Sequence, residues 1–188
     1  MKDEFKTTEK NLKIDKNNNS IKTNDRETIN MSLKDDSNFL SVFSKTETMV
    51  INSEVANFLE NQVQAFKPNQ LLTLNVTTNC VDDNEKEEYK KAIKEYYSQR
   101  YFFLTGEIKR NYLIAYVLFF IGFIILALSV FMQINFNSAI WSEVIDIMAW
   151  VFLWEAIDII AFKTKALRVE KKRCVAFVNM NVNFIEGN

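Results

Sequence analysis

Two long apolar stretches dominate the pattern of apolar and polar positions along the chain. From Tyr112 to Met132 there are 21 residues without a charged side chain. Ala139 to Phe162 forms a second stretch of 24 residues, which is apolar except for four carboxylates. A helix needs about 20 apolar residues, at ~1.5 Å of rise each, to cross a bilayer. The pattern therefore predicts a transmembrane hairpin, with helices at 111–132 and 139–162 and a loop at 133–138.

The chain before the hairpin has the shorter periods of an α/β domain. Apolar and polar residues alternate briefly within 39–51, which fits one or two short strands. Asn52 offers a helix cap, and an amphipathic helical face follows until Pro68 ends it. Leu71–Thr77 alternates as a strand, with one apolar face and one face of Thr and Asn. Residues 85–108 keep helical spacing, which predicts one rod that continues into the membrane.

After the hairpin, residues 163–173 form a short basic connector, for which a helix is one interpretation. Cys174–Phe184 alternates strictly, which predicts a strand. This strand has the same polarity as Leu71–Thr77, so we expect the two to be neighbours in one sheet. Helices at 53–66 and 85–105 would cover the apolar face of that sheet. The predicted fold class is an α+β membrane protein, in which a two-helix transmembrane hairpin is inserted into a small two-layer α/β cytosolic domain.

The predicted cytosolic domain comprises residues 39–110 and 163–188, and residues 1–38 are predicted to be a disordered tail. The tail has balanced charges and few apolar residues, so it cannot bury enough apolar area to offset the entropy of ordering. Lys and Arg lie on the domain side of both predicted membrane helices, whereas the loop at 133–138 has neither. By the positive-inside rule, both termini are cytoplasmic and the loop is external.

Composition narrows the classes of function. The net charge of −1 gives no reason to expect nucleic-acid binding. The chain has no His, and its two Cys, Cys80 and Cys174, are too far apart to form a metal-binding motif or a disulfide framework. With three Gly and one Pro, the chain has no phosphate-binding glycine loop. We therefore expect no enzyme activity, no catalytic residue, no metal and no cofactor.

The second apolar stretch holds the candidate functional residues. At ~100° per residue, five polar or Trp side chains fall within about 120° of arc, and one more carboxylate lies beside them. This intramembrane polar face consists of Glu143, Asp146, Trp150, Trp154, Glu155 and Asp158. A carboxylate at such depth costs about 2.5–3.5 kcal/mol, so it should face protein or water. Four interpretations stay open: contacts that fix helix packing, a cation-attracting pathway, a lipid or partner site, or carboxylates that only reach towards the membrane surface.

Two side chains of the first membrane helix are candidate hydrogen-bond partners for this face. Tyr116 lies at the same depth as Asp158 or Glu155. Ser129 is similarly level with Asp146 or Glu143. Such hydrogen bonds could form within one hairpin or between hairpins. Because two helices cannot hide the polar face from lipid, we expect the hairpin to form homo-oligomers.

The run from Glu143 to Asp158 reads EVIDIMAWVFLWEAID. It resembles a group of uncharacterised bacterial membrane proteins with two transmembrane helices, the second of which carries a W-V-x-x-W-E-x-[IV]-[DE]-like run. The resemblance extends loosely over residues 50–188 and implies this topology, with no activity attached to it. The Lys-, Asn- and Ile-rich composition also suits an AT-rich bacterium. We therefore expect a multi-pass protein of the inner (plasma) membrane.

Two functions fit these features. The first is a non-enzymatic integral membrane protein whose cytosolic α/β domain binds or senses a protein partner, and which oligomerises through the polar face. The second is a small pore-forming or cation-conducting membrane protein, with a membrane-disrupting effector as one form of it. The lipid bilayer is a partner in both.

Overall fold

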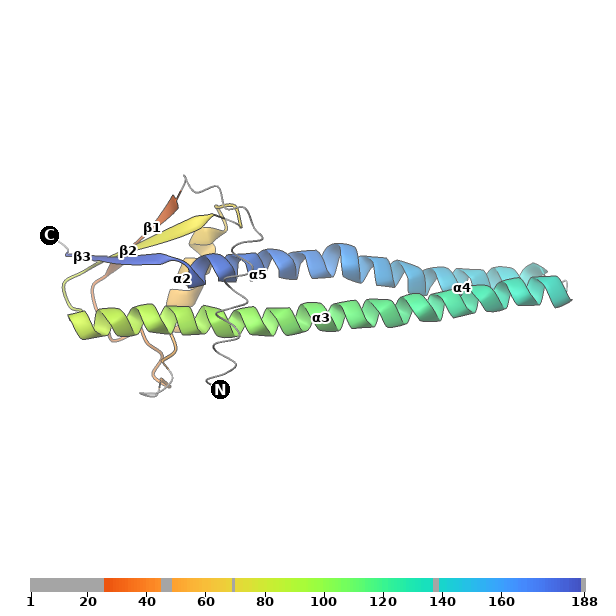
Figure 1. Ribbon diagram of the computed structural model, residues 1–188, viewed down its shortest axis with the longest axis horizontal. Helices are drawn as coiled ribbons and strands as arrows, with labels where there is room; N and C mark the ends of the chain where they lie inside the picture. Colours follow the sequence, from red (N-terminus) through yellow and green to blue (C-terminus); the bar gives the residue numbers. More distant parts are fainter. Residues whose placement is uncertain (1–25, 45–48, 69, 137–138, 187–188) are drawn as a thin grey trace. The chain divides into compact units, whose positions relative to one another are not determined.

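The computed structural model describes residues 26–44, 49–68, 70–136 and 139–186 (Figure 1). The chain divides into two compact units. Unit 1 consists of the described residues up to Phe103 together with those from Val169 onward, and unit 2 is Leu104–Arg168. Unit 1 is therefore built from the chain on both sides of unit 2.

Unit 1 contains a parallel three-stranded sheet. Its strands are β1 (Arg26–Leu33), β2 (Leu71–Thr78) and β3 (Asn181–Ile185), in the order β1-β2-β3. The pairing of β2 with β3 confirms the predicted neighbours. β1 corrects the prediction of a disordered tail at 1–38, of which residues 1–25 lie outside the described residues. Only Ile29 of β1 is fully buried, because β1 is an edge strand with one open face, and its sequence is correspondingly polar.

The helices of unit 1 begin at side chains that satisfy their first N–H groups. Asn52 caps α2 (Ser53–Val63) by accepting a hydrogen bond from the backbone N–H of Glu54. Asp82 and Glu85 cap α3 (Asp83–Phe136) reciprocally, since each carboxylate accepts from the backbone N–H of the other at 2.8 Å. α3 is a single helix of 54 residues, which confirms the predicted rod. In place of the strands expected within 39–51, the structure shows an antiparallel bridge between Leu40 and Ile51, while residues 45–48 lie outside the described part.

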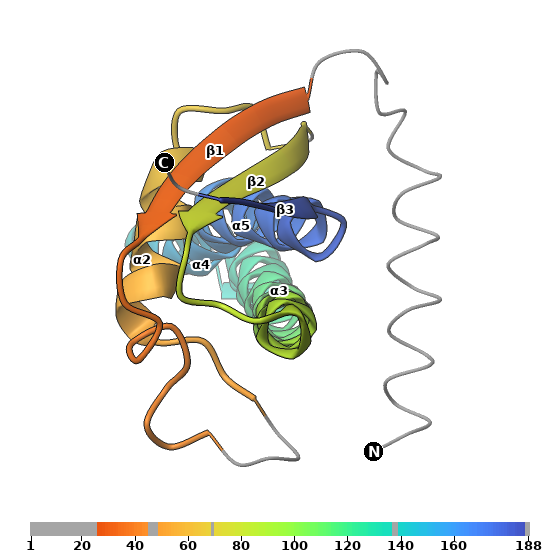
Figure 2. The same ribbon diagram turned by 90° about the vertical axis from the view of Figure 1, so that its left-hand side faces the viewer.

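The core of unit 1 lies between the sheet and one layer of helices. α2, α3 and α5 (Thr164–Val178) lie on the same side of the sheet (Figure 2). The predicted apolar face of β2 is at most 1% exposed, and it consists of Leu72, Leu74 and Val76. Within the helix layer, the rings of Tyr97 and Phe177 stack with their centroids 4.0 Å apart. These features confirm the two-layer α/β architecture.

The connector at 163–173 is helical, and the strand predicted over Cys174–Phe184 is wrong for its first seven residues. α4 (Ala139–Asp158) passes through a π-helical turn, η1 (Ile159–Lys163), into α5, which continues to Val178. Cys174 and Phe177, each 3% exposed, are three residues apart, which places them on one face of a helix and on opposite faces of a strand. Good helix formers precede them, so the helix extends and only the five residues of β3 pair with β2.

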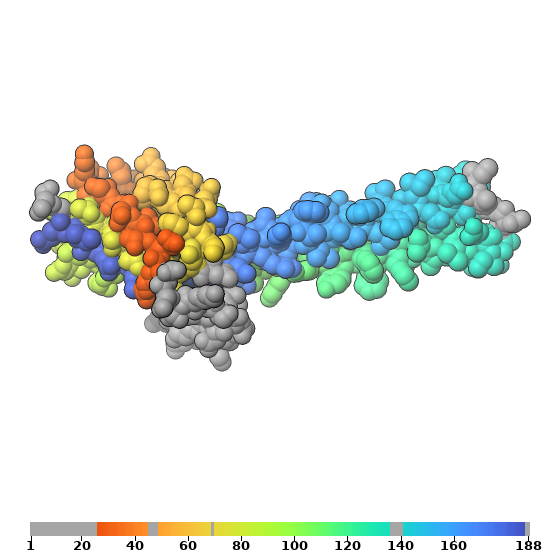
Figure 3. Space-filling view, turned by 90° about the horizontal axis from the view of Figure 1, so that it is seen from above, coloured from red at the N-terminus to blue at the C-terminus, as the bar shows by residue number. Residues whose placement is uncertain are grey.

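Unit 2 consists of the remainder of α3 alongside α4 and the start of α5 (Figure 3). α3 runs past Met132 to Phe136, so much of the predicted loop is helical, while residues 137–138 lie outside the described part. Among the described residues, one helix, Asp83–Asn135, is long and apolar enough to cross a membrane. α4 carries four carboxylates in 20 residues and does not meet that criterion. Of the two predicted membrane helices, α3 alone therefore has the composition of a membrane span.

Candidate functional site

Small residues line the contact between α3 and α4 at intervals of seven. We call this set the small-residue seam, and it comprises Ala115, Gly122 and Ser129 on α3 with Ser142, Ala149 and Ala156 on α4. All six residues are buried. Ala115 clusters with Ala156, and the Ser129 hydroxyl donates to the Ser142 carbonyl at 3.1 Å. The two helices are antiparallel, so every seventh residue along α3 lies opposite a seventh residue of α4. Because these side chains are small, the two backbones can approach closely.

The predicted polar face of α4 lies outside this seam. Trp150 and Trp154 are 54% and 62% exposed. Glu143 and Glu155 are also exposed, and Asp146 and Asp158 are half-buried. Because α3 packs on the small side chains of α4, it leaves all six of these residues partly or wholly uncovered.

Lys163 neutralises the end of the polar face that is nearest to η1. Its Nζ lies 2.8 Å from Glu155 Oε1 and 3.4 Å from Asp158 Oδ2. In a continuous α-helix, Lys163 would point ~140° away from Asp158. A π turn, whose hydrogen bonds span five residues, rotates less per residue and reduces that angle. The sequence does not reveal this cluster, because its formation depends on the position of the π turn.

The π turn also accommodates one extra residue between α4 and α5. Buried positions on α4 recur every seven residues and end at Ala156, so the next would be Lys163. The fully buried residue is instead Thr164, one position later. Both the N–H and the hydroxyl of Thr164 donate to the Ile159 carbonyl, the hydroxyl at 2.8 Å. The insertion is thereby satisfied locally, and the buried face continues into α5.

The two predicted hydrogen-bond partners make other contacts within the chain. Tyr116 is 57% exposed, its ring stacks with that of Tyr112, and Asp158 pairs with Lys163 instead. Ser129 donates to a backbone carbonyl across the seam and not to Asp146. Neither predicted pairing is among these contacts. Pairing between hairpins stays a prediction.

An ion cluster joins the three helices of unit 1. The guanidinium of Arg100 on α3 lies 2.9 Å from Glu60 of α2 and 2.5 Å from Glu170 of α5. Burial raises the pKa of Glu60 above its usual value, although the Arg100 charge acts in the opposite direction. Burial also raises the pKa of the Cys174 thiol to about 12, so this thiol is not a nucleophile. The positive charge of Arg100 is thus paired with two carboxylates.

The open face of the sheet is mostly polar, with Arg26 at one end of it. Asn75 in the central strand donates to Asn30 and accepts from Asn183, each at 3.3 Å, so an amide ladder crosses all three strands. The neighbouring row pairs Thr28 with Thr73. A strand order that follows the chain places successive crossovers on one side, which leaves the other side bare. Parallel sheets are usually covered on both faces, so this surface is a candidate site for a protein partner.

A cleft of about 280 Å³ opens at the carboxyl ends of β2 and β3. Its lining includes Val81, Phe184 and Ile185, together with Lys86, whose Nζ is held 2.8 Å from Asp83. Ligands of α/β proteins bind at this end of the strands. The cleft is smaller than the pockets of roughly 300–1,000 Å³ that enclose small molecules. We therefore assign no ligand to it.

Comparison with known proteins gives no relative from which a function could be transferred. No family model matches the chain, and no curated protein or solved structure matches it. In the part of the chain that the structure describes, no three His, Cys, Asp or Glu side chains gather as a metal site. The candidate functional features are accordingly the outward face of α4 and the open face of the sheet.

Proposed function

We propose that this chain is a non-enzymatic multi-pass membrane protein. In this proposal α3 and α4 enter the bilayer together, copies assemble through the outward face of α4, and unit 1 binds a protein partner in the cytosol. One observation carries the proposal: the helices of unit 2 present an apolar surface that the described residues of the chain do not cover. Membrane insertion and assembly are proposed because this apolar surface has to be covered by lipid or protein.

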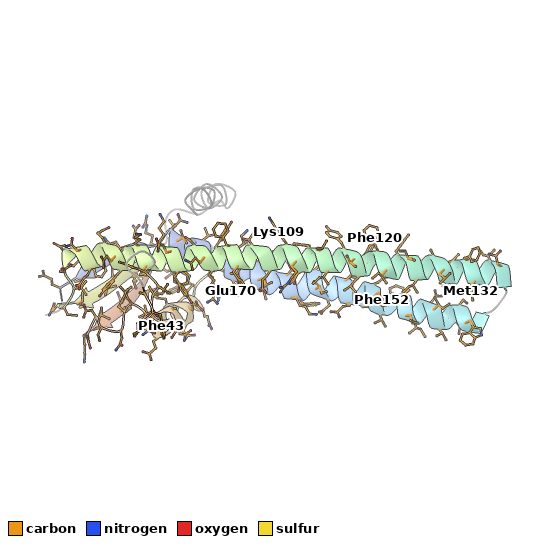
Figure 4. All side chains as sticks on the ribbon, turned by 90° about the horizontal axis from the view of Figure 1, so that it is seen from below. Phe43, Lys109, Phe120, Met132, Phe152 and Glu170 are labelled. Carbon is orange, nitrogen blue, oxygen red and sulfur yellow. The ribbon has the colours of Figure 1, made fainter. Side chains whose placement is uncertain are left out.

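The uncovered surface is extensive along α3. Only 17% of its most apolar window is buried within the chain, whereas the core helix of a soluble protein would be mostly buried. Exposed side chains include Phe120 and Phe123, at 63% and 58%. Phe120 points away from α4 (Figure 4). Fully burying one Phe or Leu side chain stabilises by about 1.5–3 kcal/mol, so such a surface requires lipid or protein around it.

Three contacts support the entry of α4 together with α3. The seam holds α4 beside the apolar part of α3, at Ala115, Gly122 and Ser129. Ionised carboxylates oppose insertion by about 2.5–3.5 kcal/mol each near the bilayer centre. The pairing of Lys163 with Glu155 and Asp158 offsets part of that cost at one end. The uneven distribution of Lys and Arg supports a topology with both termini in the cytoplasm.

Assembly would satisfy the groups that remain exposed. The exposed rings of Trp150 and Trp154 lie on the outward side of α4. Asp146 lies within the same helix and is half-buried. A second copy of the hairpin can cover these groups and supply hydrogen bonds, including one from Tyr116. Polar contacts between membrane helices contribute about 0.6–2 kcal/mol each, so a few of them suffice to hold a complex.

A cation pathway is the less supported alternative. Lys163 lies against two of the four carboxylates of α4, so a path along this face would meet a positive charge at its inner end. Only Glu143 and Asp146 are without a cation in the described part of unit 2. A cation-conducting pore is more often lined by uninterrupted rings of Asp or Glu.

The oligomeric state of the full chain in lipid nanodiscs tests the proposal. The variant Trp150→Leu/Trp154→Leu removes two outward rings of α4 and retains an apolar surface. The matched control, Phe120→Leu/Phe123→Leu, makes the equivalent change on the outward side of α3. Subunits are counted by stepwise photobleaching of a fluorescently labelled chain.

The Trp variant should shift the population towards monomers about 10- to 100-fold in the association constant, whereas the control should resemble the wild type. Equal behaviour of the two variants would refute assembly through α4. A chain that does not enter nanodiscs and remains soluble would refute the membrane proposal as a whole.

A further inference from the structure

The two ends of the helix pair in unit 2 differ in charge. The end near α5 carries Lys and Arg on both helices, from Lys109 on α3 to Arg168 on α5. The far end, over Met132–Asn135 of α3, has none. This asymmetry indicates how the helix pair would be oriented in a membrane. The ion pairs of unit 2 show which of these cations are already paired.

Part of this positive charge is already neutralised. Arg110 pairs with Glu107 at 2.9 Å, and Lys163 pairs with Glu155 and Asp158. Three further cations of unit 2 are exposed, and none of them pairs with a carboxylate of the described residues. We call these three the cationic belt: Lys109, Lys165 and Arg168. Their charge is available to an external anion.

The belt lies at one level of the helix pair. Ala115 and Ala156 are in contact and mark a common height. Lys109 lies ~9 Å along the axis from that height, and Lys165 ~13 Å in the same direction. Arg168 is further along, but its guanidinium reaches back to 5.4 Å from the ring centroid of Tyr112. Tyr112 begins the uncharged stretch of α3, which is where aromatic side chains meet lipid headgroups.

The belt also lies on more than one side of the helix pair. Lys109 points away from α4 and α5, on the opposite side of α3 (Figure 4). Lys165 and Arg168 project from the exposed surface of α5. A folded protein or a nucleic acid docks on one side and would meet only part of this charge. A shell of lipid headgroups surrounds the helices and would meet all of it.

We propose that Lys109, Lys165 and Arg168 form a binding site for anionic phospholipid headgroups, with the phosphates as hydrogen-bond acceptors. The proposal rests on the membrane insertion proposed above. Each Lys or Arg next to an anionic bilayer surface strengthens the attraction between the protein and that surface by about fivefold in binding. The chain should therefore enrich anionic lipids in its first lipid shell.

Lipid selectivity can be measured on the full chain reconstituted in vesicles of mixed phosphatidylcholine and phosphatidylglycerol. Spin-labelled forms of the two lipids, with identical acyl chains, report the motionally restricted fraction and thus a relative association constant. Three variants are compared with the wild type. The first is Lys109→Gln/Lys165→Gln/Arg168→Gln, and the second is the charge-conserving Lys109→Arg/Lys165→Arg/Arg168→Lys. The third, Lys34→Gln/Lys67→Gln/Lys91→Gln, removes three exposed cations of unit 1.

The wild type should prefer phosphatidylglycerol by about twofold or more when averaged over the shell, and raising the salt concentration should weaken that preference. The first variant should lose the preference, and the other two should keep it. A preference that survives in the first variant would overturn the inference, while an unchanged restricted fraction would still uphold membrane insertion. If neither spin-labelled lipid shows a restricted fraction, membrane insertion itself fails, and the inference with it.

Discussion

Gly122 offers a sharp test of the seam, because a second glycine on the same helix provides its control. A Cβ at Gly122 would lie 3.0 Å from Leu153 Cγ and 3.2 Å from the Ala149 carbonyl oxygen. The Leu153 side chain can rotate away, but the Ala149 oxygen is backbone and can move only if the helices separate. A Cβ at Gly106 would meet nothing within 4 Å.

The two Gly→Ala substitutions should therefore have opposite effects. Replacing Gly by Ala within a helix stabilises it by up to about 1 kcal/mol. Gly106→Ala should keep that gain. Gly122→Ala should lose it to overpacking, which costs about 1–3 kcal/mol. The expected difference is about 2 kcal/mol, or roughly 30-fold in the unfolding equilibrium.

The assay is reversible unfolding in mixed detergent micelles, followed by Trp fluorescence. All three Trp residues lie on α4, so the signal reports directly on the helix opposite Gly122. Gly122→Leu should be more destabilising than Gly122→Ala. If Gly122→Ala proved as stabilising as Gly106→Ala, the close approach of α3 and α4 would be refuted.

Two further predictions concern the ion cluster of unit 1 and the π turn. Because the pKa of Glu60 is raised in the folded state, the folded state binds more protons than the unfolded state above pH ~4.5. The wild type should therefore lose stability relative to Glu60→Gln as the pH rises through the folded pKa, in urea titrations from pH 4 to 7; an unchanged difference would contradict this. Deletion of Ala161 should convert η1 into an α-helical turn with little loss of thermal stability, because the buried positions then continue in step. Deletion of Ile147 should be strongly destabilising, because it moves Ser142 out of register with Ala149 and Ala156; equal melting temperatures would contradict the account of η1.

Much of unit 1 follows from local patterns in the sequence. The Asn52 cap, the alternation of β2 and the long periodicity of α3 all depend on neighbouring residues, and each predicted element forms. β1 escapes prediction because an edge strand with one polar face buries only Ile29 completely. α5 escapes it because the residues from Cys174 onward alternate in sequence like a strand, although the buried Cys174 and Phe177 have helical spacing.

The contacts within unit 2 depend on which faces of α3 and α4 meet, and the composition of the helices does not determine this. The six outward residues of α4 are found from the sequence because polar groups in an apolar stretch are conspicuous. The seam also leaves a pattern in the sequence, since Ala115, Gly122 and Ser129 recur every seven residues. The pattern is weak because small residues occur at many other positions. The pairing of Lys163 with Asp158 requires the π turn, whose position is set by the packing on both sides of it.

The joint insertion of α3 and α4 is tested most directly by cysteine accessibility. Asn135→Cys adds a thiol at an exposed position near the end of α3, while the native Cys80 is exposed on unit 1. Intact cells are treated with a membrane-impermeant maleimide, before and after permeabilisation. The account predicts that the thiol at position 135 reacts in intact cells and that Cys80 reacts only after permeabilisation. Reaction of both thiols only after permeabilisation would contradict it, because both would then lie on the same side of the membrane.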